Sequence, residues 1–125
     1  MLPHILLVED NAFVIGALRL LLEETGHRVS DASSLAAAVR VLRTDPPDVV
    51  LLDITLGDED GLALLSSLDA SDPRRPIVVA VTGHDDPATI ERCTRSGCRA
   101  VLVKPIRPLK LKSQIAEWLG ERAVA

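Results

Sequence analysis

Three acidic residues are the strongest candidates for chemistry in this sequence. Glu9 and Asp10 directly follow a first apolar run, and Asp53 comes at the end of a later one. If these runs are parallel strands of one sheet, the three carboxylates meet at the edge formed by the carboxyl ends of the strands. Negative charges held this close raise the pKa of at least one acid or bind a hard, oxygen-seeking cation such as Mg²⁺. The alternative is three solvated acids at loop ends, where helix dipoles favour negative charge.

A hydroxyl and an ammonium group follow two further apolar runs. Thr82-Gly83 comes after the fourth run, and Lys104-Pro105 comes after the fifth. A phosphoryl oxygen could accept hydrogen bonds from the Thr82 hydroxyl and from the flexible backbone beside it. Lysine serves phosphate as a movable point charge, so Lys104 could pair with Asp53 when that acid is free and with a phosphoryl group when one is present. Each dipeptide alone is weak evidence, and the prediction depends on their combination with the acids.

Five short apolar runs provide the strands that must position these groups. All but the second are nearly continuous in Val, Ile and Leu, which is typical of parallel strands covered on both faces, and we expect the second at an edge. Apolar residues three and four apart predict a helix after each strand. This alternation predicts an α/β fold, a doubly wound parallel sheet with right-handed crossovers. The predicted strands are His4 to Val8, His27 to Ser30, Val49 to Ile54, Ile77 to Val81 and Ala100 to Val103, and the third helix is predicted from Leu64, Leu65 and Leu68.

Length and composition exclude several classes of protein. The 125 residues, 47% of them hydrophobic, fit one domain with one core. The net charge of −4 and an aromatic content limited to Phe13 and Trp118 argue against a direct nucleic-acid partner. No apolar run approaches the ~20 residues of a membrane span, and no signal core follows a basic start, so we expect no membrane partner and a cytoplasmic location. Cys93 and Cys98 are expected to be plain thiols.

Taken together, these residues resemble the receiver domain of two-component response regulators. The resemblance covers residues 1–125 as a single receiver domain. It implies a flavodoxin-like (βα)5 fold, like that of the chemotaxis regulators, with a five-stranded parallel sheet of strand order 2-1-3-4-5. The motifs that carry it are Leu7 to Asn11, Asp53 to Gly61, Thr82-Gly83 and Lys104 to Ile106, each in its expected strand.

The resemblance also implies a role for each acid. Asp53 would accept a phosphoryl group from a phosphohistidine on a sensor histidine kinase or a histidine phosphotransfer protein. Asp10, Asp53 and the backbone carbonyl of Thr55 would bind Mg²⁺ directly, with Glu9 acting through water. Phosphoryl transfer asks a protein mainly for positioning and charge neutralisation, which these groups provide. The expected activity is limited to Mg²⁺-dependent self-phosphorylation and slow self-dephosphorylation, so the chain is not expected to be an enzyme.

Switching would follow from the same resemblance. Thr82 and Lys104 would contact the phosphoryl oxygens and move toward the new charge. In the family, the face of the fourth helix, fifth strand and fifth helix carries the output, here to an unknown protein or an attached output domain, or to a homodimer. That face would span roughly Asp86 to Ser96, Ala100 to Val103 and Pro108 to Leu119.

Four positions vary within the family or depart from its pattern. Gly57 stands where the family usually has Pro, which loosens the turn beyond the acceptor. Val101 stands where a Tyr or Phe often reports phosphorylation, so either a smaller repacking of the fourth helix carries the signal or the signal is weak. Thr55 and His84 occupy positions that tune the lifetime of the phosphoryl group in the family. His84 would position water or donate to the phosphoryl group, unless it is only an exposed loop side chain.

Three alternatives compete with a working receiver. A degenerate receiver would keep the fold as a phosphorylation-independent interaction module. A haloacid-dehalogenase-type phosphatase would need a second Asp where this chain has Thr55, and a dinucleotide-binding domain would need glycines where it has Glu9-Asp10-Asn11. A stand-alone receiver, a phosphorelay intermediate and a receiver from a hybrid kinase or longer regulator all fit the sequence.

Overall fold

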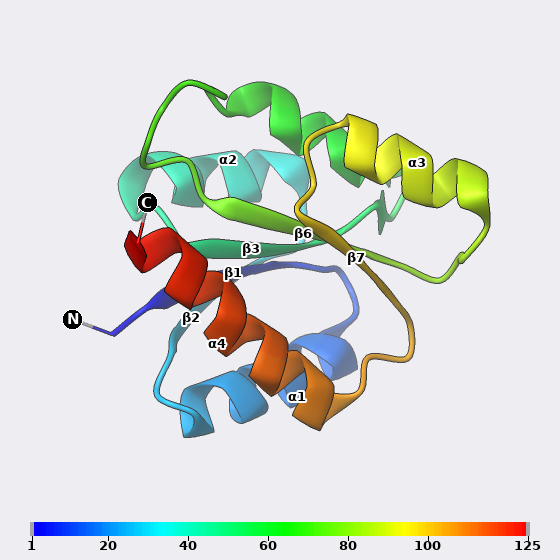
Figure 1. Ribbon diagram of the computed structural model, residues 1–125. Helices are drawn as coiled ribbons and strands as arrows, with labels where there is room; N and C mark the ends of the chain where they lie inside the picture. Colours follow the sequence, from blue (N-terminus) through cyan, green and yellow to red (C-terminus); the bar gives the residue numbers. More distant parts are fainter. Residues whose placement is uncertain (1, 125) are drawn as a thin grey trace.

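A five-stranded parallel sheet forms the centre of the molecule, and the computed structural model describes residues 2–124 (Figure 1). Its order is β2-β1-β3-β6-β7, which is the predicted order 2-1-3-4-5 when the strands of this sheet are counted along the chain. The first three continuous Val, Ile and Leu runs form the inner strands, which helices cover on both faces, and every residue of β1 and β3 is buried. The last run forms the second edge strand and is less buried. The strands are β1 (His4–Val8), β2 (Arg28–Ala32), β3 (Val49–Asp53), β6 (Ile77–Thr82) and β7 (Ala100–Val103).

Helices pack on both faces of the sheet and form two separate cores (Figure 1). On one face, Leu22 of α1 packs with Trp118 of α4 against the sheet. On the other face, Ala38 of α2, Leu64 of the 3-10 helix η1 and Cys93 of α3 form the second core. The doubly wound arrangement expected from the strand pattern is therefore confirmed. The helices are α1 (Ala12–Glu24), α2 (Leu35–Thr44), η1 (Gly61–Ser67), α3 (Pro87–Arg95) and α4 (Pro108–Val124).

The second strand lies at an edge, as predicted, but its bounds differ from the prediction. β2 begins at Arg28 and ends at Ala32, beyond the predicted end at Ser30. Its parallel pairing with β1 continues as far as the pair Val8 and Ala32. Backbone pairing with a buried neighbour therefore extends the strand through Asp31. The side chain of Asp31 is charged and exposed, so it interrupts the apolar pattern from which the strand was predicted.

The third helical segment is a 3-10 helix rather than the regular α-helix that its apolar spacing predicts. Leu64 and Leu65 are buried as expected, but η1 ends at Ser67, so Leu68 lies just beyond the helix and is half-buried. The backbone N–H of Leu68 donates to the carbonyl oxygen of Leu65 at 3.2 Å, a bond over three residues as in a 3-10 helix. Apolar residues three apart face the core in either type of helix, so the spacing alone did not separate the two.

A short hairpin that was not predicted from the sequence precedes this helix. β4 (Thr55–Leu56) pairs with β5 (Glu59–Asp60) in antiparallel fashion, leaving Gly57-Asp58 as the turn. Gly57 has φ +62°, whereas Asp58 has a negative φ. A two-residue hairpin turn with Gly first in this conformation is of type II′, whose twist suits the flanking strands. The Gly-Asp pair was the available sequence signal.

Side-chain caps fix the helix ends around the loops at the carboxyl ends of the strands. The side chain of Asn11 accepts from the backbone N–H groups of Phe13 and Val14 at the start of α1. Asp86 likewise accepts from Thr89 at the start of α3, where Pro87 occupies the first turn. Both helices therefore begin at defined points directly after the chain leaves the sheet.

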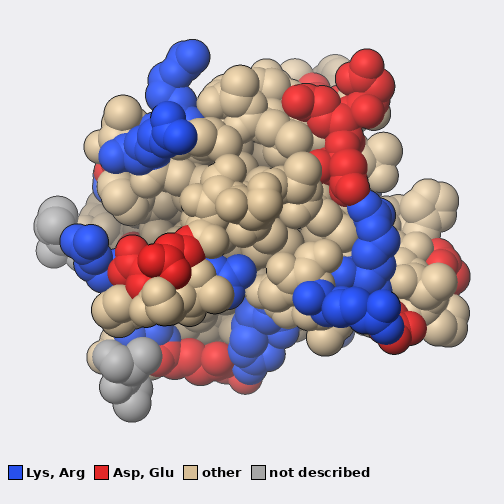
Figure 2. Space-filling model, turned by 90° about the horizontal axis from the view of Figure 1, so that it is seen from above, with Lys and Arg blue, Asp and Glu red and all other residues tan. Residues whose placement is uncertain are grey.

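Charged side chains on the outer surface of the α2, η1 and α3 layer are dispersed. Figure 2 views this layer from above and shows Lys and Arg lying beside Asp and Glu around a broad uncharged centre. Within residues 2–124, no helix has both the length and the apolar character needed to cross a membrane.

Candidate functional site

Strand pairing brings the three predicted acids together at the carboxyl ends of β1 and β3. The pair Val8 and Leu52 ends the shared ladder, so Glu9 and Asp53 follow it side by side. One carboxylate oxygen from each of Glu9, Asp10 and Asp53 lies within 4.8 Å of the others. Glu9 and Asp53 are each only 5% exposed, whereas Asp10 is exposed. This set of hard oxygen donors, open on one side, fits a divalent cation such as Mg²⁺.

Lys104 balances part of this negative charge from the end of β7. Its Nζ atom donates to Asp53 Oδ2 at 3.1 Å and to Glu9 Oε2 at 3.4 Å. The pairing of Lys104 with free Asp53, expected from the sequence, is therefore present. Burial by itself lowers the pKa of Lys104, but the hydrogen bond and negative charge of Asp53, with the charge of Glu9, raise the pKa overall. The Lys104–Pro105 peptide bond is cis.

The environment of Glu9 disfavours its negative charge. Burial is the main factor that raises its pKa, and the negative charge of Asp53 raises it further. The backbone N–H of Asn11, which donates to Glu9 Oε1 at 3.1 Å, and the charge of Lys104 only partly oppose this effect. A bound cation would offset the same cost, which is a second reason why the donor set fits a metal ion.

The carboxylate of Asp53 is held by the loop that follows it. The backbone N–H of Thr55 donates to Asp53 Oδ1 at 2.9 Å, so each carboxylate oxygen has its own donor. Gly61 packs directly against this loop: a Cβ atom at Gly61 would lie 2.1 Å from the carbonyl oxygen of Asp53 and 2.8 Å from the Cα atom of Ile54. Only glycine allows this approach. Gly61 is also the first residue of η1, with Asp60 as its cap, and this requirement for glycine was not predicted from the sequence.

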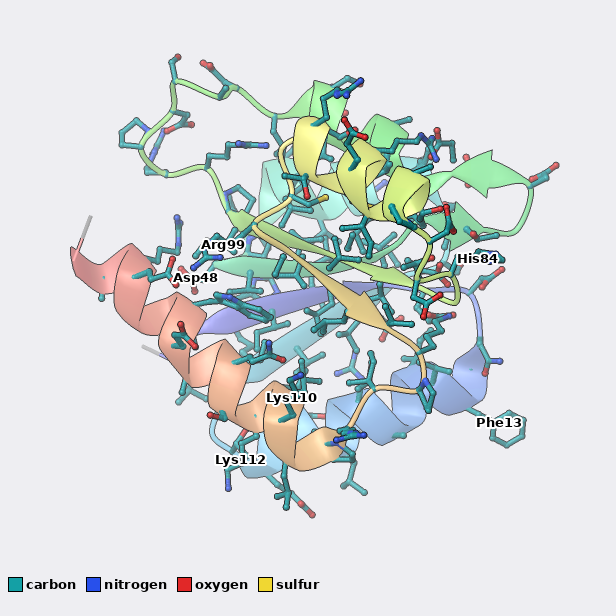
Figure 3. The ribbon with its side chains drawn as sticks, turned by 45° about the vertical axis from the view of Figure 1, so that its right-hand side comes forward. Phe13, Asp48, His84, Arg99, Lys110 and Lys112 are labelled. Atoms are coloured by element: carbon teal, nitrogen blue, oxygen red, sulfur yellow. The ribbon has the colours of Figure 1, made fainter. Side chains whose placement is uncertain are left out.

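Thr82 and His84 lie at the neighbouring strand end and bind each other rather than the acids. Thr82 is almost completely buried, and its hydroxyl accepts from the backbone N–H of His84 at 3.0 Å. The carbonyl of Thr82 accepts from the backbone N–H of Lys104 at 2.8 Å. The His84 side chain is exposed at the same edge (Figure 3). Within residues 2–124, no hydrogen bond joins either side chain to the acids.

Gly57 and Val101, which depart from the family pattern, lie at the tip of the hairpin and against the core, respectively. A Cβ atom at Gly57 would lie 3.7 Å from Asp10 Oδ2, so the hairpin tip lies beside the acidic cluster. Proline cannot adopt the φ of +62° found at Gly57, because its ring holds φ near −65°. Val101 is half-buried and packs against the core formed with α2, η1 and α3. This aliphatic side chain cannot perform an aromatic rotation.

Comparison with known proteins identifies the family. Residues 5–116 match the family described as response regulator receiver domain. The chain therefore belongs to the response regulator receiver domains, which are signalling modules of two-component systems rather than enzymes. It is 31% identical over 122 residues to the polar-differentiation response regulator DivK of Brucella ovis, covering 97% of this chain and 99% of DivK. A CheY-like receiver domain protein from Methanospirillum hungatei JF-1 has the same fold, with a TM-score of 0.89 at 25% identity and 98% coverage of both chains.

Other relatives are considerably longer than this chain. The alginate biosynthesis transcriptional regulatory protein AlgB of Pseudomonas putida is 32% identical over 122 residues. That match covers 98% of this chain but 27% of AlgB, so the chain spans about a quarter of the length of this relative. The acidic cluster of Glu9, Asp10 and Asp53 is typical of the Mg²⁺ site of receiver domains.

Proposed function

We propose that the chain is a working phosphoacceptor receiver and that Asp53 accepts a phosphoryl group from a phosphohistidine. The environment of the Asp53 carboxylate carries this proposal. Thr55 N–H holds one oxygen and Lys104 holds the other, while the buried Glu9 stands on the same side. A carboxylate fixed in this way is positioned as a nucleophile, and an adjacent cation neutralises the charge that builds up during transfer.

Mg²⁺ would be held by Asp10, Asp53 and the backbone carbonyl of Thr55, with Glu9 acting through water. The spacing of the carboxylate oxygens, within 4.8 Å, and the cost of the buried negative charge on Glu9 support this assignment. The ion would neutralise phosphoryl oxygens. Asp10, the exposed member of the cluster, leaves the site open to an incoming phosphoryl donor.

Thr82 and Lys104 would respond to the phosphoryl group. Lys104 already contacts Asp53, so a phosphoryl group on that carboxylate offers it a stronger anionic partner within reach. The hydroxyl of Thr82 accepts from the N–H of His84, and turning it toward a phosphoryl oxygen would release that bond and shift the loop leading into α3. The affinity of these groups for the phosphoryl oxygens sets how far the population moves.

Thr55 and His84 would tune the lifetime of the phosphoryl group. Both side chains are exposed at the edge of the site, where a hydrolytic water would enter. The imidazole of His84 could donate to a phosphoryl oxygen or position a water molecule. We expect His84→Ala to change the dephosphorylation rate when it is measured between about pH 6 and 8. An unchanged rate across this range would refute a role for His84.

Two kinds of partner follow from this proposal. The phosphoryl donor would be a sensor histidine kinase or a histidine phosphotransfer protein. The output would be an unknown protein, an attached domain or a second copy of the chain, reached through the face formed by α3, β7 and α4. The Arg99 guanidinium, just before β7, donates to the Glu121 carboxylate of α4 at 3.0 and 2.9 Å and so joins two of these elements.

The deciding experiment is phosphorylation by a small donor. We would incubate the protein with acetyl phosphate, with and without Mg²⁺, and measure its intact mass. Asp53→Asn tests the acceptor, and Asp58→Asn, at the exposed tip of the adjacent hairpin, is the matched control. The proposal requires a gain of one phosphoryl group that needs both Mg²⁺ and Asp53 and persists in the control. No gain, under conditions that label a known receiver, favours the degenerate interaction module.

A further inference from the structure

The loop after the proposed acceptor is held by a contact from outside the site. We call residues 53–61 the acceptor loop; it contains the β4–β5 hairpin. Within this hairpin, Thr55 pairs with Asp60. Because the N–H of Thr55 fixes Asp53 Oδ1, any displacement of Asp60 shifts the strand pair that carries this donor. The position of Asp60 therefore bears directly on the geometry of the acceptor carboxylate.

Asp60 makes two contacts, one with each carboxylate oxygen. Its Oδ1 atom accepts from the backbone N–H of Leu62 at 3.1 Å and caps η1. Its Oδ2 atom forms an ion pair and a hydrogen bond with Arg92 of α3. The two charged side chains are half-exposed, at 53% for Arg92 and 50% for Asp60, so water and salt have access to the contact.

The helix that carries Arg92 is also connected to the second strand end of the site. Thr82 ends β6, and the loop from Gly83 leads to the cap residue Asp86 of α3. α3 is therefore attached to the site twice, through this loop at its start and through Arg92 further along. Figures 1 and 3 both show α3 passing beside the hairpin.

The neighbouring arginines do not contact the acceptor loop, so the contact made by Arg92 is specific to its position. Arg95, one turn further along α3, pairs with Glu91 of the same helix. Arg99 pairs with Glu121 of α4. Among the ion pairs of the described residues, the one between Arg92 and Asp60 is the pair that joins α3 to the acceptor loop.

We propose that Arg92 is a positioning residue for the acceptor loop: through Asp60 and the hairpin it holds Thr55, and thereby the carboxylate of Asp53, in place. The same contact gives phosphorylation a route to α3 that needs no aromatic side chain at Val101. The positioning role concerns the unphosphorylated chain, whereas the route to α3 rests on the proposed phosphorylation of Asp53.

The positioning role is tested without phosphorylation, by hydrogen exchange of the Thr55 amide. Asp60→Asn removes the charge but keeps an oxygen that caps Leu62, and Arg92→Gln removes the other charge. Each is expected to speed exchange by about two- to fivefold, the range of exposed ion pairs. The double variant should exchange no faster than either single one, because both remove the same contact. Arg95→Gln is the matched control and should leave exchange unchanged.

Salt dependence separates an electrostatic contact from a packing effect. At about 1 M salt the Debye length falls to roughly 3 Å, so the difference between the wild type and Arg92→Gln should shrink. Equal exchange in wild type and Arg92→Gln at low salt, or the same acceleration in Arg95→Gln, would overturn the positioning role.

The route to α3 is tested by NMR after acetyl phosphate treatment. In the wild type, phosphorylation should shift the amide signals of Cys93 and Thr94 in α3, and Arg92→Gln should reduce these shifts by about half or more, while Arg95→Gln retains them. Full shifts in Arg92→Gln would overturn the route. A wild type that gains no phosphoryl group would instead overturn the proposed function, while the exchange experiment would still decide the positioning role.

Discussion

Gly61→Ala should destabilise the protein and disturb the acceptor carboxylate. The added Cβ atom would lie 2.1 Å from the carbonyl oxygen of Asp53 and 2.8 Å from the Cα atom of Ile54. Both obstacles are backbone atoms of a buried strand end, so no flexible side chain can move aside. The acceptor loop must therefore shift as a whole.

The expected loss can be built from two contributions. Forcing extra volume into a close-packed region costs about 1–3 kcal/mol. The shift also weakens the hydrogen bond from Gly61 N–H to the carbonyl oxygen of Ile54, 2.9 Å long, which contributes about 0.5–1.5 kcal/mol. We therefore expect the free energy of unfolding to fall by about 2–4 kcal/mol, out of the roughly 5–15 kcal/mol usual for a domain.

Urea unfolding followed by tryptophan fluorescence measures this loss. Trp118 is the single tryptophan and is 3% exposed in the core beneath α4, on the face opposite η1, so it reports global unfolding. Gly16→Ala is the matched control, because Gly16 is exposed in α1 with no atom within 4 Å of an added Cβ. That control should gain about 0.5–1 kcal/mol from better helix propensity.

The two variants thus add the same methyl group, but we expect the free energy of unfolding to fall in Gly61→Ala and to rise in Gly16→Ala. A loss below about 1 kcal/mol in Gly61→Ala, with the control behaving as expected, would show that the acceptor loop yields easily and would refute the reasoning from rigid backbone contact. A shifted amide signal of Thr55 should accompany the loss, because its N–H fixes Asp53 Oδ1.

Three further predictions concern the acids, the lysine and the hairpin. The pKa of Glu9 is raised above 4.5 by burial and by Asp53, so above that pH the folded protein holds more protons than the unfolded chain. Without Mg²⁺, the free energy of unfolding measured in urea should therefore fall as the pH rises through the raised pKa of Glu9, and Glu9→Gln should abolish the fall. Lys104→Met removes an ammonium group that lies 3.1 Å from Asp53 and 3.4 Å from Glu9. Calorimetry should detect Mg²⁺ binding about three- to tenfold tighter than in the wild type, and an unchanged affinity would contradict the charge balance inferred for the site. Gly57→Ala places a side chain at φ +62° and should lower the stability measured by thermal unfolding by about 1–2 kcal/mol, and Gly57→Pro should lower it further. If both variants were as stable as the wild type, the turn would readily adopt another conformation.

The strands and the acidic cluster could be predicted because both depend on local patterns and one general rule. Runs such as Val49 to Leu52 are continuously apolar, and only a strand covered on both faces uses such a run. The carboxyl ends of parallel strands meet at one edge, so Glu9 and Asp53 had to approach each other once their strands were neighbours. The strand order itself came from the resemblance to receiver domains.

The third helix illustrates where the pattern was insufficient. Leu62 and Leu65 face the core in the 3-10 helix as they would in an α-helix, so the apolar spacing is nearly the same for both. Backbone hydrogen bonding over three residues, from Leu68 to Leu65, and the packing of Gly61 against Asp53 fix the local geometry instead. The hairpin was missed because its strands are only two residues each, although Gly57-Asp58 was a usable turn signal.

The sequence by itself determined the fold class, the family and the residue types available to the site, because these depend on periodicity and on motifs read along the chain. The tertiary structure decided which groups touch. Lys104 reaches both Asp53 and Glu9, Arg92 reaches the acceptor loop, and the hydroxyl of Thr82 is engaged by His84 rather than by the acids. The physical reason is that these contacts join segments on different strands and helices, and their geometry is set by how the layers pack rather than by any local preference of the chain.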